Sequence, residues 1–93
     1  MATLLIAYDL NKPETDPEFA AFLDAIKAFE AWAKLMRVGL WLVKTEETPV
    51  QVRDRLGALL PEGARLVVFD VTSRPGAWRS LPSDVSTWIR DRI

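Results

Sequence analysis

The residues best suited to chemistry stand where the first apolar run of the chain ends. Leu4–Ala7 is followed by Tyr8, Asp9 and, two positions later, Asn11. A rigid strand aims the side chains at its end into the adjoining loop, where a carboxylate suits a hard divalent cation such as magnesium. If two copies of the chain met at a two-fold axis, their Asp9 side chains could share one ion. Such an ion would activate water and neutralise charge on a phosphate, which is the chemistry of phosphodiester hydrolysis.

The same aspartate has a simpler interpretation, in which Asp9 caps a turn with Asn11 or pairs with a lysine or arginine. A single carboxylate at a strand end is compatible with either interpretation. Asp70 ends another apolar run, but that strand should be antiparallel to the first, so we expect Asp70 toward the opposite end of the sheet in a structural role. Glu46 and Glu47 precede a predicted helix start, where the helix dipole favours negative charge.

An aromatic residue between two arginines marks a second candidate site. Trp78 stands between Arg74 and Arg79 in a connection between two predicted elements. An aromatic ring can stack on a nucleic-acid base while guanidinium groups contact phosphate, so these residues could contact a nucleic acid or another partner. In the alternative interpretation, Trp78 folds back over the sheet or over the edge of an interface. Trp41 and Trp88 occupy periodic apolar patterns, which predicts a place in the core or in a dimer interface.

The composition excludes several kinds of site. The 93 residues include no cysteine and no histidine, which excludes disulfides, thiolate zinc sites, iron–sulfur clusters and the Ser-His and Cys-His catalytic pairs. The formal net charge of −1 provides no overall basic excess for binding phosphates, although the segment from Pro49 onward holds seven arginines and five acidic residues. The apolar runs are too short to span a bilayer and the N-terminus lacks signal-peptide features, which predicts a soluble, cytoplasmic protein without a membrane partner.

Apolar spacing along the chain changes between the periods of strands and helices. Runs of β-branched and aromatic residues predict strands, whereas spacings of three and four predict helices with one apolar side. Thr15–Glu18 and Thr48–Gln51 have the residue types of a capping box at a helix start. The segment 31–44 could form one long strand, but Gly39 favours a hairpin. The predicted elements are strands at 3–8, 31–36, 39–44 and 66–71 and helices at 17–29, 48–60 and 83–93.

This order of elements predicts an α+β fold, a ferredoxin-like βαββαβ sandwich with an additional C-terminal helix, as a single domain over residues 1–93. Two helices would cover one face of its sheet. The strands are apolar on both sides, so the other face needs cover from the C-terminal helix or from a second copy of the chain. We therefore expect a homodimer.

Two segments carry a resemblance to a known family. Leu4–Leu10 and Gly39–Lys44 make the chain similar to the small SinR-like proteins. These resemble, more distantly, the CRISPR-associated ferredoxin-like nuclease of spacer acquisition and the VapD-type toxins. In the CRISPR-associated family, the aspartate that closes the first strand after a tyrosine is the proposed metal ligand at the homodimer interface. The resemblance therefore implies a magnesium ion on Asp9, with Tyr8 beside it.

Two functions follow as expectations. In the first, the chain is a homodimeric, magnesium-dependent endonuclease of DNA or RNA, in which Asp9 binds the ion and Tyr8 or Asn11 helps to orient it. In the second, the chain is a non-catalytic dimeric module that binds a protein or nucleic-acid partner through the loop around Trp78 and its flanking arginines. Loss of activity in Asp9→Ala would distinguish the first function, and loss of partner binding in Trp78→Ala the second.

Overall fold

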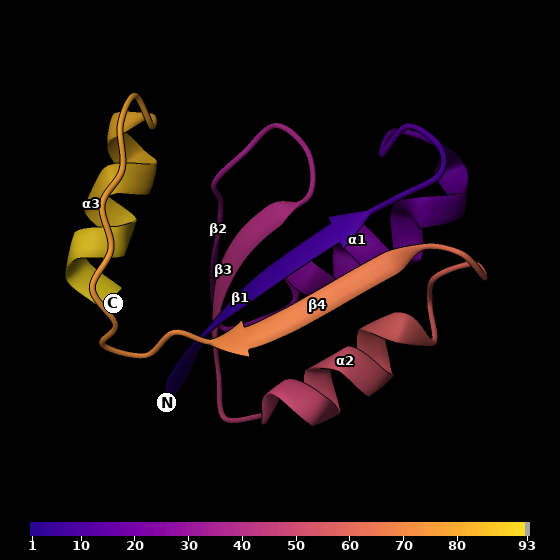
Figure 1. Cartoon of the computed structure of the whole chain (residues 1–93), viewed down its shortest axis with the longest axis horizontal. Helices are drawn as coiled ribbons and strands as arrows, with labels where there is room; N and C mark the ends of the chain where they lie inside the picture. Colours follow the sequence, from indigo (N-terminus) through magenta and orange to yellow (C-terminus); the bar gives the residue numbers. More distant parts are fainter. Residues whose placement is uncertain (93) are drawn as a thin grey trace.

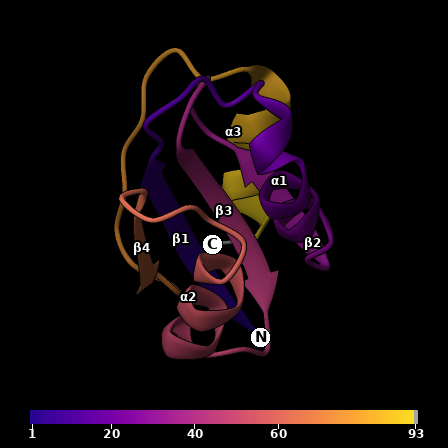
Figure 2. The ribbon, with the colours of Figure 1, turned by 90° about the vertical axis from the view of Figure 1, so that its right-hand side faces the viewer.

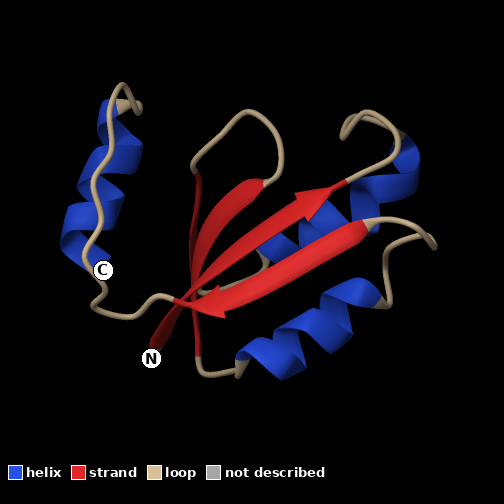
Figure 3. Cartoon of the chain, viewed as in Figure 1, coloured by secondary structure: helices blue, strands red, loops and turns tan. Residues whose placement is uncertain are grey.

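The chain folds into one sheet and three α-helices in a computed structural model that describes residues 1–92. The elements in chain order are β1 (Ala2–Asp9), the short 3-10 helix η1 (Pro17–Phe19), α1 (Ala20–Lys27), β2 (Ala31–Lys34), β3 (Leu40–Thr45), α2 (Pro49–Gly57), β4 (Arg65–Asp70) and α3 (Ser83–Arg92). The strand order is β2-β3-β1-β4 and every pair of neighbours is antiparallel (Figures 1 and 3). These elements confirm the predicted α+β class, the hairpin and the C-terminal helix, whose expected last residue, Ile93, lies outside the described residues. No helix within residues 1–92 has the length and apolar character needed to cross a bilayer.

The start of α2 follows its sequence signal, whereas the helix expected from residue 17 begins as the 3-10 turn η1 and becomes α-helical at Ala20. The Thr48 hydroxyl accepts a hydrogen bond from the Gln51 amide at 3.2 Å, and the Gln51 side chain accepts one from the Thr48 amide at 2.9 Å, which completes the predicted capping box of α2. At η1, Asp16 caps the first turn by accepting from the Glu18 amide at 3.0 Å. The Glu18 carboxylate binds Lys12 at 2.6 Å instead of closing a second capping box, so that part of the prediction is wrong.

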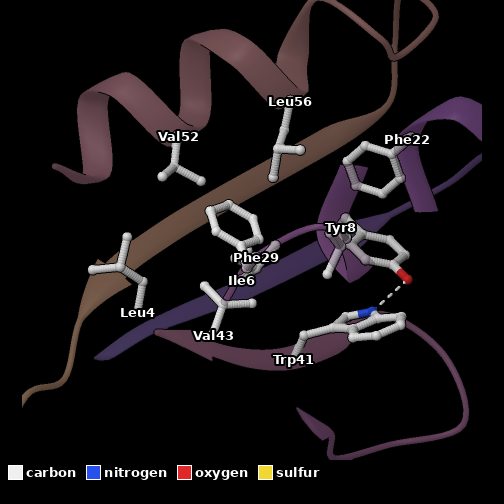
Figure 4. Close-up of a cluster of buried hydrophobic side chains, with 10 residues drawn as sticks. Leu4, Ile6, Tyr8, Phe22, Phe29, Trp41, Val43, Val52 and Leu56 are labelled. Carbon is white, nitrogen blue, oxygen red and sulfur yellow. Dashed lines mark hydrogen bonds between the residues drawn. The ribbon is translucent and has the colours of Figure 1, made fainter. Parts of the chain in front are cut away.

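The main core lies between the sheet and the helices α1 and α2. Alternate β1 side chains, Leu4, Ile6 and Tyr8, point to this side and are buried. They meet Trp41 and Val43 from β3 and apolar side chains from both helices (Figure 4). Trp41 is 1% exposed, which confirms its predicted place in the core. We call this side of the sheet the core face.

The opposite side, which we call the second face, is only partly covered. α3 lies beside the β2 and β3 end of the sheet, apart from the other helices (Figure 1), and buries Ile89. Leu42 of β3 is also buried on this side. Toward the other edge, Val67 and Phe69 of β4 remain 47% and 59% exposed. The C-terminal helix was one of the two expected covers of the second face, and α3 covers only the part over β2 and β3.

A long connection joins β4 to α3. It leaves the end of β4 and crosses to the side of the molecule where α3 lies (Figure 2). Residues 72–80 of this connection are exposed, and Ser73 and Ser80 have positive φ angles of 56° and 64°. The connection is therefore an irregular, exposed loop, and it carries Arg74, Trp78 and Arg79.

Candidate functional site

Asp9 lies where the sequence predicts it, at the end of the central strand β1. Its side chain is exposed on the second face, directly across the strand pair from Arg65 of β4. Together with Ala7 and Val67, these residues border a shallow hollow of about 260 Å³. Arg65 is thus the arginine nearest in register to Asp9, although Asp9 takes part in none of the ion pairs found among residues 1–92.

Tyr8 points away from Asp9, because consecutive strand residues face opposite sides of the sheet. Its hydroxyl accepts a hydrogen bond from Trp41 Nε1 at 2.8 Å (Figure 4). The same hydroxyl donates a hydrogen bond to Glu14 Oε2 at 2.9 Å. Burial raises the pKa of this hydroxyl well above its ordinary value. Asn11 lies exposed in the loop that follows β1. The structure therefore groups Asp9 with Arg65 rather than with Tyr8.

The fit to a divalent cation depends on a second copy of the chain. A carboxylate oxygen is a suitable ligand for magnesium, and Asp9 is open to solvent. Within residues 1–92, no three acidic side chains gather in a way that could hold an ion. Asp9 is the one carboxylate among the described residues that border this hollow, and an ion shared with the Asp9 of a second copy stays a prediction.

Glu14 forms a partly buried polar cluster that the sequence did not reveal. Its carboxylate binds Lys34 Nζ, accepts from the Tyr8 hydroxyl, and accepts from the Gly39 amide at 3.4 Å. The Lys34 ammonium also lies 5.3 Å from the centre of the Trp41 ring. Burial raises the pKa of the Glu14 carboxyl, but the hydrogen bonds from Lys34 and Tyr8 outweigh burial and leave this pKa below its ordinary value.

This lowered pKa predicts that Glu14 contributes to stability at neutral pH. A carboxylate whose folded-state pKa lies below its unfolded value stabilises the fold above that unfolded value, and loses this effect as pH falls through the folded value. We therefore expect the difference in unfolding free energy between the wild type and Glu14→Gln to shrink as pH falls below about 5. Urea unfolding of both proteins between neutral and acidic pH measures it.

The control for this experiment is Glu62→Gln, which changes an exposed carboxylate after α2. Its difference from the wild type should stay small throughout the same pH range. A difference for Glu14→Gln that is equally constant would show that ionisation of Glu14 does not stabilise the fold.

Arg74, Trp78 and Arg79 line one cavity of about 540 Å³ between the connection and the second face. Its walls include Leu42 from β3 and Ile89 from α3. We call this space the loop cavity; its lining residues are Leu35, Met36, Leu40, Leu42, Arg74, Gly76, Ala77, Trp78, Arg79, Leu81 and Ile89. The structure therefore brings together the three residues that the sequence singled out in this segment.

Contacts to α3 fix the Trp78 side chain. The indole Nε1 donates to the Ser86 hydroxyl at 3.1 Å, and the Arg90 guanidinium lies 5.7 Å from the ring centre. Trp78 is nevertheless 38% exposed. The ring thus packs against α3 and still presents surface to a partner, whereas the predicted cover over the sheet or an interface edge stays a prediction.

Basic residues line the loop cavity and the hollow next to it. Arg79 also borders an adjoining hollow of about 520 Å³ that Lys34 and Arg37 line. None of the described residues that line the loop cavity is acidic. Arg74 is close enough to Asp70 to help lower the pKa of that carboxyl, after the larger effect of hydrogen bonds from Thr72.

Asp70 has the structural role that the sequence predicts. Its Oδ1 accepts from the Thr72 hydroxyl at 2.6 Å and from the Thr72 amide at 2.9 Å. Thr72 in turn accepts a hydrogen bond from the Thr3 amide at 2.9 Å, which ties the end of β4 to the start of β1. Asp70 pairs in register with Leu4, so it lies at the opposite end of β1 from Asp9.

Comparison with known proteins gives no indication of function. The chain matches no protein-family model, no curated protein and no solved structure. The observations that bear on function are therefore the position of Asp9 on the open part of the second face and that of Trp78 with two arginines at the loop cavity.

Proposed function

We propose that this chain is a non-catalytic, homodimeric interaction module that contacts its partner through the loop cavity. The observation that carries the proposal is the convergence of Arg74, Trp78 and Arg79 on one cavity with apolar walls. Concave apolar sites with a few convergent polar groups are the usual form of a binding site. The proposal accounts for an aromatic ring that is exposed although hydrogen bonding fixes its position.

The proposed fold is ferredoxin-like. The βαββαβ order of elements, followed by α3, supports it. The strand order β2-β3-β1-β4 supports it further, because β1 and β3 occupy the centre of the sheet and β4 and β2 the edges. In such a sheet the two crossover helices pack on one side, as α1 and α2 do on the core face.

The proposed second copy would cover the open part of the second face. Val67 and Phe69 are exposed there, next to the partly buried Leu5 and Ala7 of β1. β4 is also an edge strand, and apolar edge strands favour pairing with another chain. A symmetric contact through this region would bury the patch in both copies at once.

Replacing Trp78 tests the partner site. We expect Trp78→Ala to weaken binding about 10-fold or more, because a stacking or anchoring aromatic contributes on that scale. The probes are fluorescein-labelled single-stranded and double-stranded oligonucleotides of DNA and RNA, and a labelled acidic peptide. Fluorescence anisotropy gives the dissociation constants, and light scattering gives the number of copies in each variant.

Trp32→Ala is the matched control, because Trp32 of β2 is 39% exposed and Trp78 is 38% exposed. Trp32 does not line the loop cavity, so its removal should leave binding within about 2-fold of the wild type. Equal effects of the two substitutions would argue against a site at the loop cavity.

A second candidate function is the magnesium-dependent endonuclease, and the position of Asp9 favours it. This carboxylate is exposed at the end of a central strand, on the same part of the second face that the proposed second copy would cover. In that arrangement the carboxylate oxygens of Asp9 would hold magnesium, which supplies charge neutralisation and an activated water. Arg65, opposite Asp9, is placed to contact a phosphate oxygen.

The nuclease is tested by cleavage of labelled DNA and RNA with magnesium, with and without EDTA. If the chain cuts, Asp9→Ala should lower the rate by about 100-fold or more, because metal-assisted charge stabilisation supplies several kcal/mol. Asp24→Ala, which removes an exposed carboxylate from α1, should leave the rate unchanged. Cleavage by the wild type that persists in Asp9→Ala would reject Asp9 as the metal ligand.

A further inference from the structure

We infer that the loop cavity binds a small amphipathic anion, an apolar group that carries one carboxylate, sulfonate or phosphate. The inference rests on the same cavity as the proposed function but names a ligand that fills it. The cavity volume of about 540 Å³ lies in the range of small-molecule sites, which is roughly 300–1,000 Å³.

The walls of the cavity favour an apolar group. Leu40 and Leu42 come from β3 on the second face, and Ile89 comes from the buried side of α3. Most of the lining side chains are apolar, so a nucleobase placed there would pair few of its polar edges, which costs free energy. A hydrocarbon chain or an unsubstituted aromatic ring meets no such cost and gains from burial.

The two arginines of the lining favour a negative charge. Arg74 and Arg79 both line the cavity, and no described lining residue is acidic. Neither arginine is in an ion pair among residues 1–92. A guanidinium group binds carboxylate or phosphate oxygens with two parallel hydrogen bonds, so two arginines can hold one anionic head group while the apolar part enters the cavity.

Trp78 would report occupancy of the cavity directly. Its ring lines the cavity, and its indole N–H is fixed on Ser86 at 3.1 Å. A ligand beside the ring would change the environment of this N–H, whereas Trp32 lies outside the lining. The indole N–H signals of the chain, assigned with Trp78→Phe, thus separate binding in the cavity from binding elsewhere.

The experiment titrates the full chain with dodecanoate and dodecylamine below their critical micelle concentrations and with dodecanol below its solubility limit. The fluorescent sulfonate 1-anilinonaphthalene-8-sulfonate serves as a reporter for competition. We expect saturable binding of one dodecanoate per chain, at least about 10-fold tighter than dodecanol, because a charged hydrogen bond contributes on that scale. The Trp78 indole signal should shift during the titration and the Trp32 signal should not.

Four variants test the location of the site and the role of charge. Arg74→Ala and Arg79→Ala should each weaken the binding of dodecanoate about 10-fold and leave the binding of dodecanol unchanged. Arg53→Ala on α2 should change the binding of neither ligand. Ala77→Trp places a large ring in the cavity from an exposed loop position, so it should abolish binding without disturbing the sheet.

The inference is overturned if dodecanol or dodecylamine binds as tightly as dodecanoate, or if Ala77→Trp binds like the wild type. If no amphipathic anion binds but Trp78→Ala still weakens an oligonucleotide or the acidic peptide, the small ligand is rejected and the proposed function stands. If dodecanoate binds as expected while none of the macromolecular probes depends on Trp78, the proposed function is rejected and the ligand site stands.

Discussion

Replacing Gly39 with alanine is expected to lower the unfolding free energy by about 3 kcal/mol or more, from left-handed backbone strain and steric overlap together. Gly39 has a φ of +78°, a region that a side chain disfavours. A Cβ atom at this position would stand 2.6 Å from the carbonyl oxygen of Tyr8. That oxygen belongs to a backbone held in place, because the Tyr8 amide donates to the Gly39 carbonyl at 3.0 Å. Urea or guanidinium unfolding measures the change.

Two other glycines separate the causes. Gly63 has a φ of +91° but open space around it, so Gly63→Ala should cost only the backbone strain, about 1–2 kcal/mol. Gly57 lies in α2 with open space and no positive φ, so Gly57→Ala should stabilise the fold by about 0.5–1 kcal/mol. If Gly39→Ala lowers the unfolding free energy no more than Gly63→Ala does, the backbone near Tyr8 moves away from the new Cβ atom without a cost in stability.

Trp41→Ala is expected to lower the unfolding free energy by about 4 kcal/mol, within the range for large aromatic residues in cores. The ring is 1% exposed and packs among the side chains of the core face (Figure 4). Its Nε1 also supplies the hydrogen bond that the Tyr8 hydroxyl accepts at 2.8 Å. The unfolding free energy of a domain of this length is about 5–14 kcal/mol, so Trp41→Ala would remove a large part of the stability.

The indole N–H and the ring volume can be examined separately. Trp41→Phe keeps most of the apolar ring but removes the donor to Tyr8, and should cost about 1–2 kcal/mol. Trp32→Ala removes a neighbouring tryptophan, 5.4 Å from Trp41 between ring centres, that is 39% exposed, and should cost about 1 kcal/mol. Thermal or urea unfolding measures these losses. A larger loss of unfolding free energy for Trp32→Ala than for Trp41→Ala would contradict the assignment of Trp41 to the core.

The elements and their sides follow from local patterns in the sequence. Thr48 and Gln51 are three residues apart, so the capping box depends on neighbours that the sequence shows directly. The outcome at Glu18 differed because Lys12, six residues away in the preceding loop, competes for its carboxylate. Such competition depends on the path of the loop, which residue types alone do not reveal.

The candidate sites divide in the same way. Arg74, Trp78 and Arg79 lie within six positions, so their grouping could be predicted, whereas the cavity beside them needs Leu42 and Ile89 from distant parts of the chain. Glu14 was missed for the same reason. Its partner Lys34 is 20 positions away, and no short motif marks a carboxylate that will be buried by such a partner.

Because α3 is only modestly buried, it can detach from the sheet while the rest of the chain stays folded. Ile89 is its only buried side chain among residues 83–92, and its other links to the body include the hydrogen bonds from Trp78 to Ser86 and from the Thr3 hydroxyl to the Arg92 carbonyl. Amide protons in such a helix exchange with solvent when the helix detaches locally. Those of the central strand β1 exchange only when the whole domain unfolds. A molecule held between α3 and the sheet would therefore slow exchange in the helix selectively, so that protection of its amides records the occupancy of the cavity beneath it.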